Sequence, residues 1–194
     1  MTRLGGIDAN FLYLETAETP MHVAGFTLFD LPEGYAGSFH ENYRDMLKSR
    51  LHLVPIFSKK LAPTLLDIHH PSWVDAPDVD FSYHFRHVTL PAPGSFEQLE
   101  QTIAQLHSQQ LDRSRPLWQF TTIDGIHNGQ VALYSKVHHA AVDGGAGMVI
   151  TNTMYDVTPV PRQVKPAEPA KPTPTAPPNP IGDLVSSMVR FQLD

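Results

Sequence analysis

The sequence contains no cysteine in its 194 residues. This absence excludes a cysteine nucleophile, a disulfide framework and a thiolate metal site, and it fits a reducing cytoplasm. No run of apolar residues approaches the length of a membrane-spanning helix. The N-terminal residues also lack the charged and apolar regions of a signal peptide. We therefore expect a cytoplasmic protein whose contact with membranes or lipid droplets, where it occurs, is peripheral.

Clustered positive charge is also missing, because lysine and arginine are scattered and the formal net charge is -6. Proteins that bind nucleic acid concentrate positive charge on one face, so the sequence excludes nucleic acid as the main partner. The adjacent His69 and His70 lack further ligands at a recognisable spacing, and no metal site is assigned. Hydrophobic residues make up 41% and charged residues 18% of the chain, which is typical of a globular domain.

Residues 1–157 carry the mixture of strand and helix signals that is typical of an α/β domain. Strands are predicted over residues 21–29, 81–90, 117–123 and 131–137, and helices over residues 38–51, from Ser95 and from about Met148. Ser95 is followed three residues later by Gln98, the capping-box pattern of a helix start. Gly125 and Gly129 lie between the last two strands and predict a hairpin.

The composition changes after this domain, because proline becomes dense over residues 158–180. Such a stretch is extended and semi-rigid, so it is predicted to be a linker outside the core. Apolar residues then recur at helical spacing from Ile181, which predicts that residues 181–194 begin an amphipathic helix. Because the sequence stops about four turns into this helix, we expect a longer parent protein with a further C-terminal domain.

The run from His138 to Gly144 carries the strongest chemical signal, two histidines followed by Asp143 and glycine. It comes directly after a predicted strand, from whose end an imidazole can project into a cleft. An imidazole titrates near neutrality and can take a proton from an alcohol. Neighbouring strand residues point to opposite faces, so only one histidine can enter a given cleft. His139 is the candidate general base because Asp143 lies four residues after it, and His138 is the candidate support from the other side.

Asp143 has two alternative roles. It could orient His139, as the acid of a catalytic triad does. It could instead anchor the turn by pairing with an arginine or with backbone N–H groups, and the adjacent glycine, which indicates a tight turn, favours this anchor. Gly144 and Gly145 leave room for a substrate to approach the backbone. Their N–H groups are candidate hydrogen-bond donors to a tetrahedral intermediate.

Four blocks of the sequence, in order, resemble the bacterial wax ester synthase/acyl-CoA:diacylglycerol acyltransferase family of the CoA-dependent acyltransferase superfamily. The blocks are Asp8–Glu15 followed by Pro20–Val23, Leu90–Gly94, Leu111–Trp118 and His138–Gly144. The last is the HHxxxDG motif, which alone is specific only to the superfamily. The third contains the Pro-Leu-Trp motif, formed by Pro116, Leu117 and Trp118. We interpret this motif as structural, because it fixes the entry and packing of a strand.

The resemblance implies an α/β half-domain of the CoA-dependent acyltransferase type, in which a mixed β-sheet is packed with α-helices in a sandwich. It implies transfer of a fatty acyl group from acyl-CoA to the hydroxyl of diacylglycerol or of a long-chain alcohol, giving triacylglycerol or wax ester. His139 would be the general base. The sequence has no cysteine and no G-x-S-x-G elbow, which favours direct transfer without an acyl-enzyme. No cofactor is expected, because acyl-CoA is a substrate.

Members of this family carry a second half after a proline-rich linker, with the catalytic channel between the halves. The expected partner is therefore a C-terminal half of the same protein, in one polypeptide or as a separate chain. This chain alone is expected to be weakly active or inactive. Two alternatives stay open. A condensation domain of peptide synthesis shares HHxxxDG but uses an amine acceptor, and the first and third blocks speak against it. A non-catalytic lipid-droplet or partner-binding module would keep the motif as a relic.

Overall fold

A four-stranded mixed sheet organises the domain. In the computed structural model, which describes residues 2–62, 70–142, 144–158 and 160–166, the strand order is β2-β7-β6-β5. The strands are β2 (His22–Phe29), β5 (Phe85–Thr89), β6 (Trp118–Asp124) and β7 (Val131–His138). β7 pairs antiparallel with both neighbours, whereas β5 and β6 are parallel. Parallel strands need a crossover connection, and helix α4 (Phe96–Ser108) lies within it.

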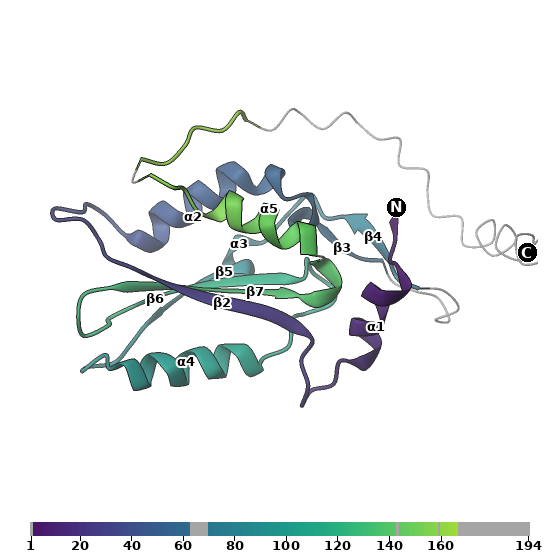
Figure 1. Cartoon of the computed structure of the whole chain (residues 1–194), viewed down its shortest axis with the longest axis horizontal. Coiled ribbons are helices and arrows are strands. Elements are labelled where there is room, and N and C mark those ends of the chain that lie inside the picture. Colours follow the sequence, from purple (N-terminus) through teal and green to yellow (C-terminus); the bar gives the residue numbers. More distant parts are fainter. Residues whose placement is uncertain (1, 63–69, 143, 159, 167–194) are drawn as a thin grey trace, which may run out of the picture. The chain divides into compact units, whose positions relative to one another are not determined.

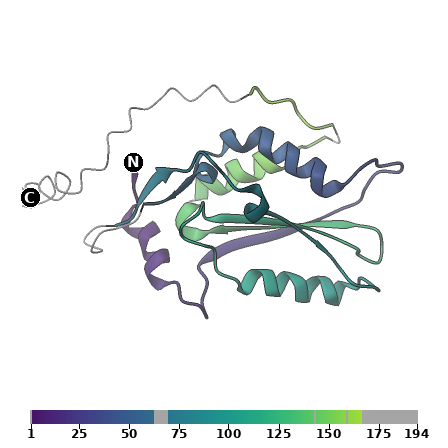
Figure 2. The ribbon, with the colours of Figure 1, turned by 180° about the vertical axis from the view of Figure 1, so that it is seen from behind.

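Helices cover both faces of this sheet (Figure 1). Helices α2 (Phe39–Arg50) and α5 (Gly144–Met154) lie on one face, and α4 lies on the opposite face. The view from behind shows the same layers (Figure 2). Each face of the sheet buries its apolar side chains under one helical layer. The predicted sandwich of a mixed β-sheet and α-helices is confirmed.

A smaller antiparallel sheet, with strand order β1-β4-β3, lies in the N-terminal part of the fold. Its strands are β1 (Thr2–Arg3), β3 (Lys59–Leu61) and β4 (Ser72–Asp75). Helix α1 (Gly6–Leu14) follows β1, and its buried Leu12 belongs to the same apolar cluster as Trp73 and Leu117. The short helical turns are η1 (Leu51–Leu53), η2 (Pro55–Ser58), α3 (Phe81–His84) and η3 (His139–Ala141). α1 contacts η3, so the N-terminal segment supports the turn that follows β7.

Local side-chain hydrogen bonds set several element boundaries. The Ser38 hydroxyl accepts a hydrogen bond from the Glu41 backbone N–H at the start of α2. Ser95 and Gln98 make both bonds of a capping box at the start of α4. Gly125 and Gly129, in the turn between β6 and β7, have φ of 76° and 79°, a region that glycine enters without steric cost. The helix starts predicted at Ser38 and Ser95 and the hairpin are confirmed, whereas α5 begins at Gly144, before the predicted start near Met148.

The strand predicted over residues 81–90 is wrong in its first half. The chain instead forms the one-turn helix α3, and only residues 85–89 are extended. Asp80 explains the difference, because its carboxylate accepts hydrogen bonds from the backbone N–H groups of Ser82 and Tyr83. This N-cap stabilises a helical turn that the alternating apolar pattern does not reveal.

The main apolar core lies between the sheet and the layer of α2 and α5. Its buried members come from helices, strands and the η2 turn: Tyr43, Leu47, Val54, Phe57, Phe85, Trp118, Phe120, Leu133, Val137, Ile150 and Met154. Trp118, at the start of β6, is 1% exposed and stacks on Phe57 with ring centroids 4.8 Å apart. Its indole N–H donates to the Phe57 carbonyl over 2.9 Å. The Pro-Leu-Trp motif thus places two buried side chains, Leu117 and Trp118, at the start of this strand.

The compact unit extends to Val164, beyond the predicted start of the linker at residue 158. Arg50 of α2, which is 1% exposed, accounts for part of this extension. Its guanidinium donates to Asp156 over 2.6 Å and to the Arg162 carbonyl over 3.1 Å. The predicted amphipathic helix over residues 181–194 lies outside the described residues, as does most of the predicted linker.

Replacement of Trp118 by alanine tests the role assigned to the Pro-Leu-Trp motif. Removing a buried indole leaves a cavity and an unpaired carbonyl, so Trp118→Ala should lower the free energy of unfolding by about 3–5 kcal/mol. Chemical denaturation followed by circular dichroism measures this loss. Val157→Ala is the control, because Val157 is fully exposed and its loss should change stability by less than about 0.5 kcal/mol. Equal stability of both variants would contradict a structural role.

Candidate active site

The end of β7 delivers the HHxxxDG motif to one edge of the sheet. His138 is the last residue of β7, and His139 begins the η3 turn. Asp143 lies outside the described residues, so neither of its two predicted roles is tested. Gly144 and Gly145 are the first two residues of α5, where backbone N–H groups have no partner within the helix. The motif therefore links a strand end to a helix start through a single tight turn.

The His138 side chain is fully buried. Its Nδ1 accepts a hydrogen bond from the Ala140 backbone N–H over 3.0 Å, which assigns the proton of the neutral ring to Nε2. Nε2 lies 3.5 Å from a carboxylate oxygen of Glu15. Burial lowers the pKa of His138 below its ordinary value, and the nearby Glu15 carboxylate only partly opposes this shift. His138 is therefore a neutral ring that braces the η3 turn.

The His139 side chain is partly exposed and stacks on Phe11 of α1. The two rings are nearly parallel, at an angle of 11° with centroids 3.9 Å apart. The His139 backbone N–H donates to the Met21 carbonyl over 2.8 Å. Its ring Nδ1 is enclosed and has no hydrogen-bond partner within the described part of the chain. This arrangement holds the imidazole from one side.

Glu15 carries the buried negative charge of this region, with a side chain that is only 1% exposed. Arg113 donates to one carboxylate oxygen through Nη2 at 2.8 Å and through Nε at 3.1 Å. The Met21 backbone N–H donates to the other oxygen over 3.1 Å. Burial raises the pKa of Glu15, but the hydrogen bonds from Arg113 and Met21 outweigh burial and lower the pKa below its ordinary value. Glu15 is therefore ionised at neutral pH.

Two further buried polar side chains near His138, Lys136 and His22, donate hydrogen bonds to backbone carbonyls. Lys136, which is 1% exposed, donates from Nζ to the carbonyls of Leu106 and Gln109 at the end of α4. Burial lowers the pKa of Lys136 to about 8. His22, opposite His138 in the register of β2 and β7, donates from Nε2 to the His107 carbonyl over 2.7 Å. These contacts tie β7 and β2 to α4.

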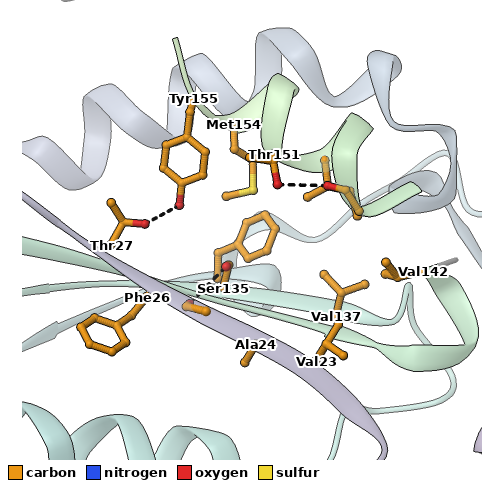
Figure 3. Close-up of a pocket in the computed structure, with 14 residues that line it drawn as sticks. Val23, Ala24, Phe26, Thr27, Ser135, Val137, Val142, Thr151, Met154 and Tyr155 are labelled. Atoms are coloured by element: carbon orange, nitrogen blue, oxygen red, sulfur yellow. Dashed lines mark hydrogen bonds between the residues drawn. The ribbon is translucent and has the colours of Figure 1, made fainter. Parts of the chain in front are cut away.

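An apolar groove runs beside the motif, between α5 and the strands β2 and β7 (Figure 3). Val137 and Val142, which flank the η3 turn in sequence, line one end, and Thr27 and Tyr155 line the other. The hydroxyls in the wall already have partners. Thr27 pairs with Tyr155 over 2.8 Å, and Thr151 donates to a carbonyl of its own helix over 3.0 Å. The groove therefore presents a mainly apolar surface.

Sequence reasoning missed the groups that surround the two histidines. Three of these groups, Phe11, Glu15 and Met21, lie in the first of the four sequence blocks, and Arg113 lies in the third. The sequence alone assigns none of them an individual role. Glu15 and Arg113 are 98 residues apart, and no local pattern connects two residues at that separation. No group of three His, Asp or Glu side chains converges to hold a metal within the described ranges. In the same residues, no helix combines the length and apolar character that a membrane crossing requires.

Comparison with known proteins identifies the group to which the domain belongs. The wax ester synthase/diacylglycerol acyltransferase catalytic domain family matches residues 4–190. The chain belongs to this family. The resemblance predicted from the four sequence blocks is confirmed.

Two relatives from Mycobacterium tuberculosis illustrate the similarity. A probable diacylglycerol O-acyltransferase is 37% identical over 158 residues, which cover 81% of this chain and 58% of the relative. A putative diacylglycerol O-acyltransferase is 41% identical over 157 residues, which cover 79% of this chain and 34% of the relative. The chain thus spans between about a third and three fifths of the length of these relatives.

Solved structures show the same fold. The wax ester synthase/diacylglycerol acyltransferase from Marinobacter aquaeolei VT8 superposes with a TM-score of 0.67 at 36% identity, covering 77% of this chain and 37% of that one. The starter condensation domain of the rhizomide synthetase RzmA superposes with a TM-score of 0.60 at 14% identity, covering 100% of this chain and 46% of that one. At this low identity the second similarity shows the fold alone. The predicted CoA-dependent acyltransferase fold is confirmed.

The titration of His22 gives a prediction for the stability of the domain. Burial, together with the nearby Lys136 charge, lowers the pKa of His22 to about 4. Above pH 6.5 the ring is neutral in both states. Between pH 6.5 and 4 the unfolded chain binds a proton that the folded chain excludes, so stability should fall as the pH falls, by about 3 kcal/mol in total from this group.

Urea denaturation at half-unit pH steps measures this effect, with His22→Gln as the comparison because glutamine keeps an N–H donor. The variant should lose less stability than the wild type between pH 6.5 and 4. Above pH 7 the two proteins should differ by a constant offset. Identical pH dependence in the two proteins would show that His22 does not supply the effect.

Proposed function

We propose that this chain supplies the catalytic histidine of an O-acyltransferase, which moves a fatty acyl group from acyl-CoA to the hydroxyl of diacylglycerol or of a long-chain alcohol. The observation that carries the proposal is the placement of His139. Its ring stacks on Phe11 and is partly exposed, and in sequence it lies between Val137 and Val142, which line one end of an apolar groove. The membership of the family and the names of its relatives support the same reaction.

In the proposed mechanism His139 acts as a general base. Nε2 takes the proton of the acceptor hydroxyl, while Nδ1 is enclosed by the protein. The oxygen forms a bond to the thioester carbonyl carbon, and the carbon–sulfur bond breaks as the tetrahedral intermediate collapses. The imidazolium returns its proton to the CoA thiolate. The N–H groups of Gly144 and Gly145 at the start of α5 are the proposed donors to the oxyanion. The reaction needs no cofactor, because acyl-CoA is consumed as a substrate.

The groove is the proposed site for the hydrocarbon of the acyl group. Its polar side chains already have hydrogen-bond partners, so the wall offers little to a polar ligand and favours an acyl chain. Residues 23–27 of β2 line it over about 13 Å at the usual rise of a strand. This length suits a medium or long acyl chain. A variant of the RzmA starter condensation domain has been solved in complex with C8-CoA, which agrees with acyl-CoA binding to this type of fold.

Ester formation is favoured over the two alternatives. The family that matches this chain is named for ester synthesis, whereas the condensation domain is only 14% identical. A module that had lost catalysis would not need the His139 imidazole to be held by stacking on Phe11. Because the relatives are longer than this chain, we propose that a C-terminal half, in the same polypeptide or a separate one, completes the channel. Such lipid substrates would bring the complete enzyme to membranes or lipid droplets as a peripheral protein.

Substitution of His139 tests the proposed acyl transfer. The assay uses the protein purified from its own cell, together with any chain that copurifies with it. CoA release from palmitoyl-CoA is measured with hexadecanol or dioleoylglycerol, and the ester is identified by mass spectrometry. His139→Ala should lower the rate by about 100-fold to 10,000-fold, because the general base is lost. His127→Ala, at the exposed far end of the β6–β7 hairpin, should retain the wild-type rate. Full activity of His139→Ala would refute the proposed mechanism.

A substitution in the groove tests where the acyl chain binds. Thr151 lines the groove from α5, beyond the end that lies beside the motif. Thr151→Phe should block the distal part and lower the rate with palmitoyl-CoA at least about tenfold relative to octanoyl-CoA. Met148→Phe is the matched control, because Met148 is on the same helix, 66% exposed and outside the groove. An unchanged preference between the two acyl-CoA substrates in Thr151→Phe would place the acyl chain elsewhere.

A further inference from the structure

A buried carboxylate close to the catalytic turn has no part in the proposed proton transfer. Glu15 follows the C-terminus of α1, and its oxygens meet groups from three separate segments. These segments are the Met21 loop, the loop that carries Arg113, and the end of β7. A charge that is 1% exposed in this setting is costly unless several donors compensate it. The convergence of segments on one carboxylate points to a specific role.

Two routes connect Glu15 to the catalytic turn. The first runs through a side chain, because Glu15 Oε1 lies 3.5 Å from His138 Nε2, and His138 Nδ1 accepts the Ala140 N–H within η3. The second runs through the backbone. Glu15 accepts the Met21 N–H, and the carbonyl of Met21 accepts the His139 N–H. Glu15 is therefore tied to His139 from both sides of the turn.

The donors around Glu15 select a carboxylate over the isosteric amide. Arg113 presents two N–H groups to one oxygen, while the Met21 N–H and His138 Nε2–H face the other. A carboxylate accepts on both oxygens. A glutamine would turn an NH2 group toward one of these sets of donors and leave it unpaired. The site therefore requires the charge of Glu15 and the matching charge of Arg113.

Arg113 completes the arrangement by fixing Glu15 to the helix. Besides its two bonds to the carboxylate, its guanidinium donates to the Leu12 carbonyl near the end of α1 over 2.6 Å. The planar guanidinium can hold one carboxylate oxygen with two donors and a carbonyl with a third, which a lysine ammonium cannot reproduce. Phe11, which stacks on the His139 ring, lies on the same helix. The ion pair thus sets both the turn and the helix against which the catalytic ring rests.

We propose that Glu15, held by Arg113, is the positioning residue that fixes the backbone and ring of His139 for acyl transfer. This inference rests on the proposed function for its kinetic consequence, but its structural consequence stands independently. Glu15 does not line the acyl groove. Removal of the Glu15 charge should therefore lower kcat and leave the KM for acyl-CoA nearly unchanged. The reason is that displacement of His139 slows proton transfer without changing the groups that bind acyl-CoA.

The test compares three variants of the protein as produced in its cell. Glu15→Gln removes the charge, and Arg113→Lys keeps the charge but loses the planar fork. Glu18→Gln is the matched control, because Glu18 is exposed and lies in the same loop. Amide hydrogen exchange at His139 reports the bond to Met21, kcat and KM report catalysis, and circular dichroism with thermal denaturation reports folding.

We expect Glu15→Gln to speed the His139 exchange at least about tenfold, through local opening of the turn. The kcat should fall at least about tenfold, with the KM for palmitoyl-CoA within about threefold of the wild type. Arg113→Lys should show intermediate effects, and Glu18→Gln none. The positioning role is overturned if Glu15→Gln folds and shows wild-type exchange at His139. If Glu15→Gln does not fold, the same result in folded Arg113→Lys overturns it. If the wild-type protein releases no CoA but Glu15→Gln still speeds the His139 exchange, the proposed function is refuted and the positioning of His139 by Glu15 is not.

Discussion

The candidate site depends on the alternation of side chains along β7, which pairs with β2 on one side and with β6 on the other. Successive residues point to opposite faces, so Val137 enters the layer under α5 while Lys136 and His138 enter the layers of α4 and α1. The chain leaves the strand directly after His138. His139 thus begins the η3 turn directly after the strand, with its ring against Phe11. A shift of one residue in the register of β7 would exchange these faces and place an apolar side chain over Glu15.

The polar face of β7 imposes a second constraint, because the side chains of Lys136 and His138 are buried inside the sandwich. The groups that contact these two side chains differ in kind. Lys136 bonds to carbonyls at the end of α4, where helix carbonyls lack partners within the helix. His138 instead meets an ionised carboxylate whose charge Arg113 balances. The first arrangement attaches a helix to the sheet. The second brings α1, the Met21 loop and the η3 turn together, so the fold and the candidate site share the same buried contacts.

The parts of the structure that were predictable from the sequence depend on short-range patterns. The capping box at Ser95 and the glycines of the hairpin act within a few residues, and each was found. The α3 turn was missed because the Asp80 cap competes with an alternating apolar pattern over the same residues. His139 can be singled out as a candidate base from the sequence because its motif is contiguous. The Glu15–Arg113 pair was not assigned, since two charges 98 residues apart meet only after the sheet and α1 have formed.

The exposure of the groove indicates what the proposed enzyme would need beyond this domain. β2 is an edge strand of the sheet, and its Val23, which lines the groove, remains 41% exposed. A wall of this kind can orient an acyl chain but does not exclude water from the thioester. Water competes with the acceptor hydroxyl for the same carbonyl carbon, so selective ester formation requires that the groove be covered during transfer. The relatives extend well beyond the matched region, which provides chain for such a cover. In the proposed enzyme, this domain therefore determines where the proton goes, and the covering segment determines which nucleophile attacks.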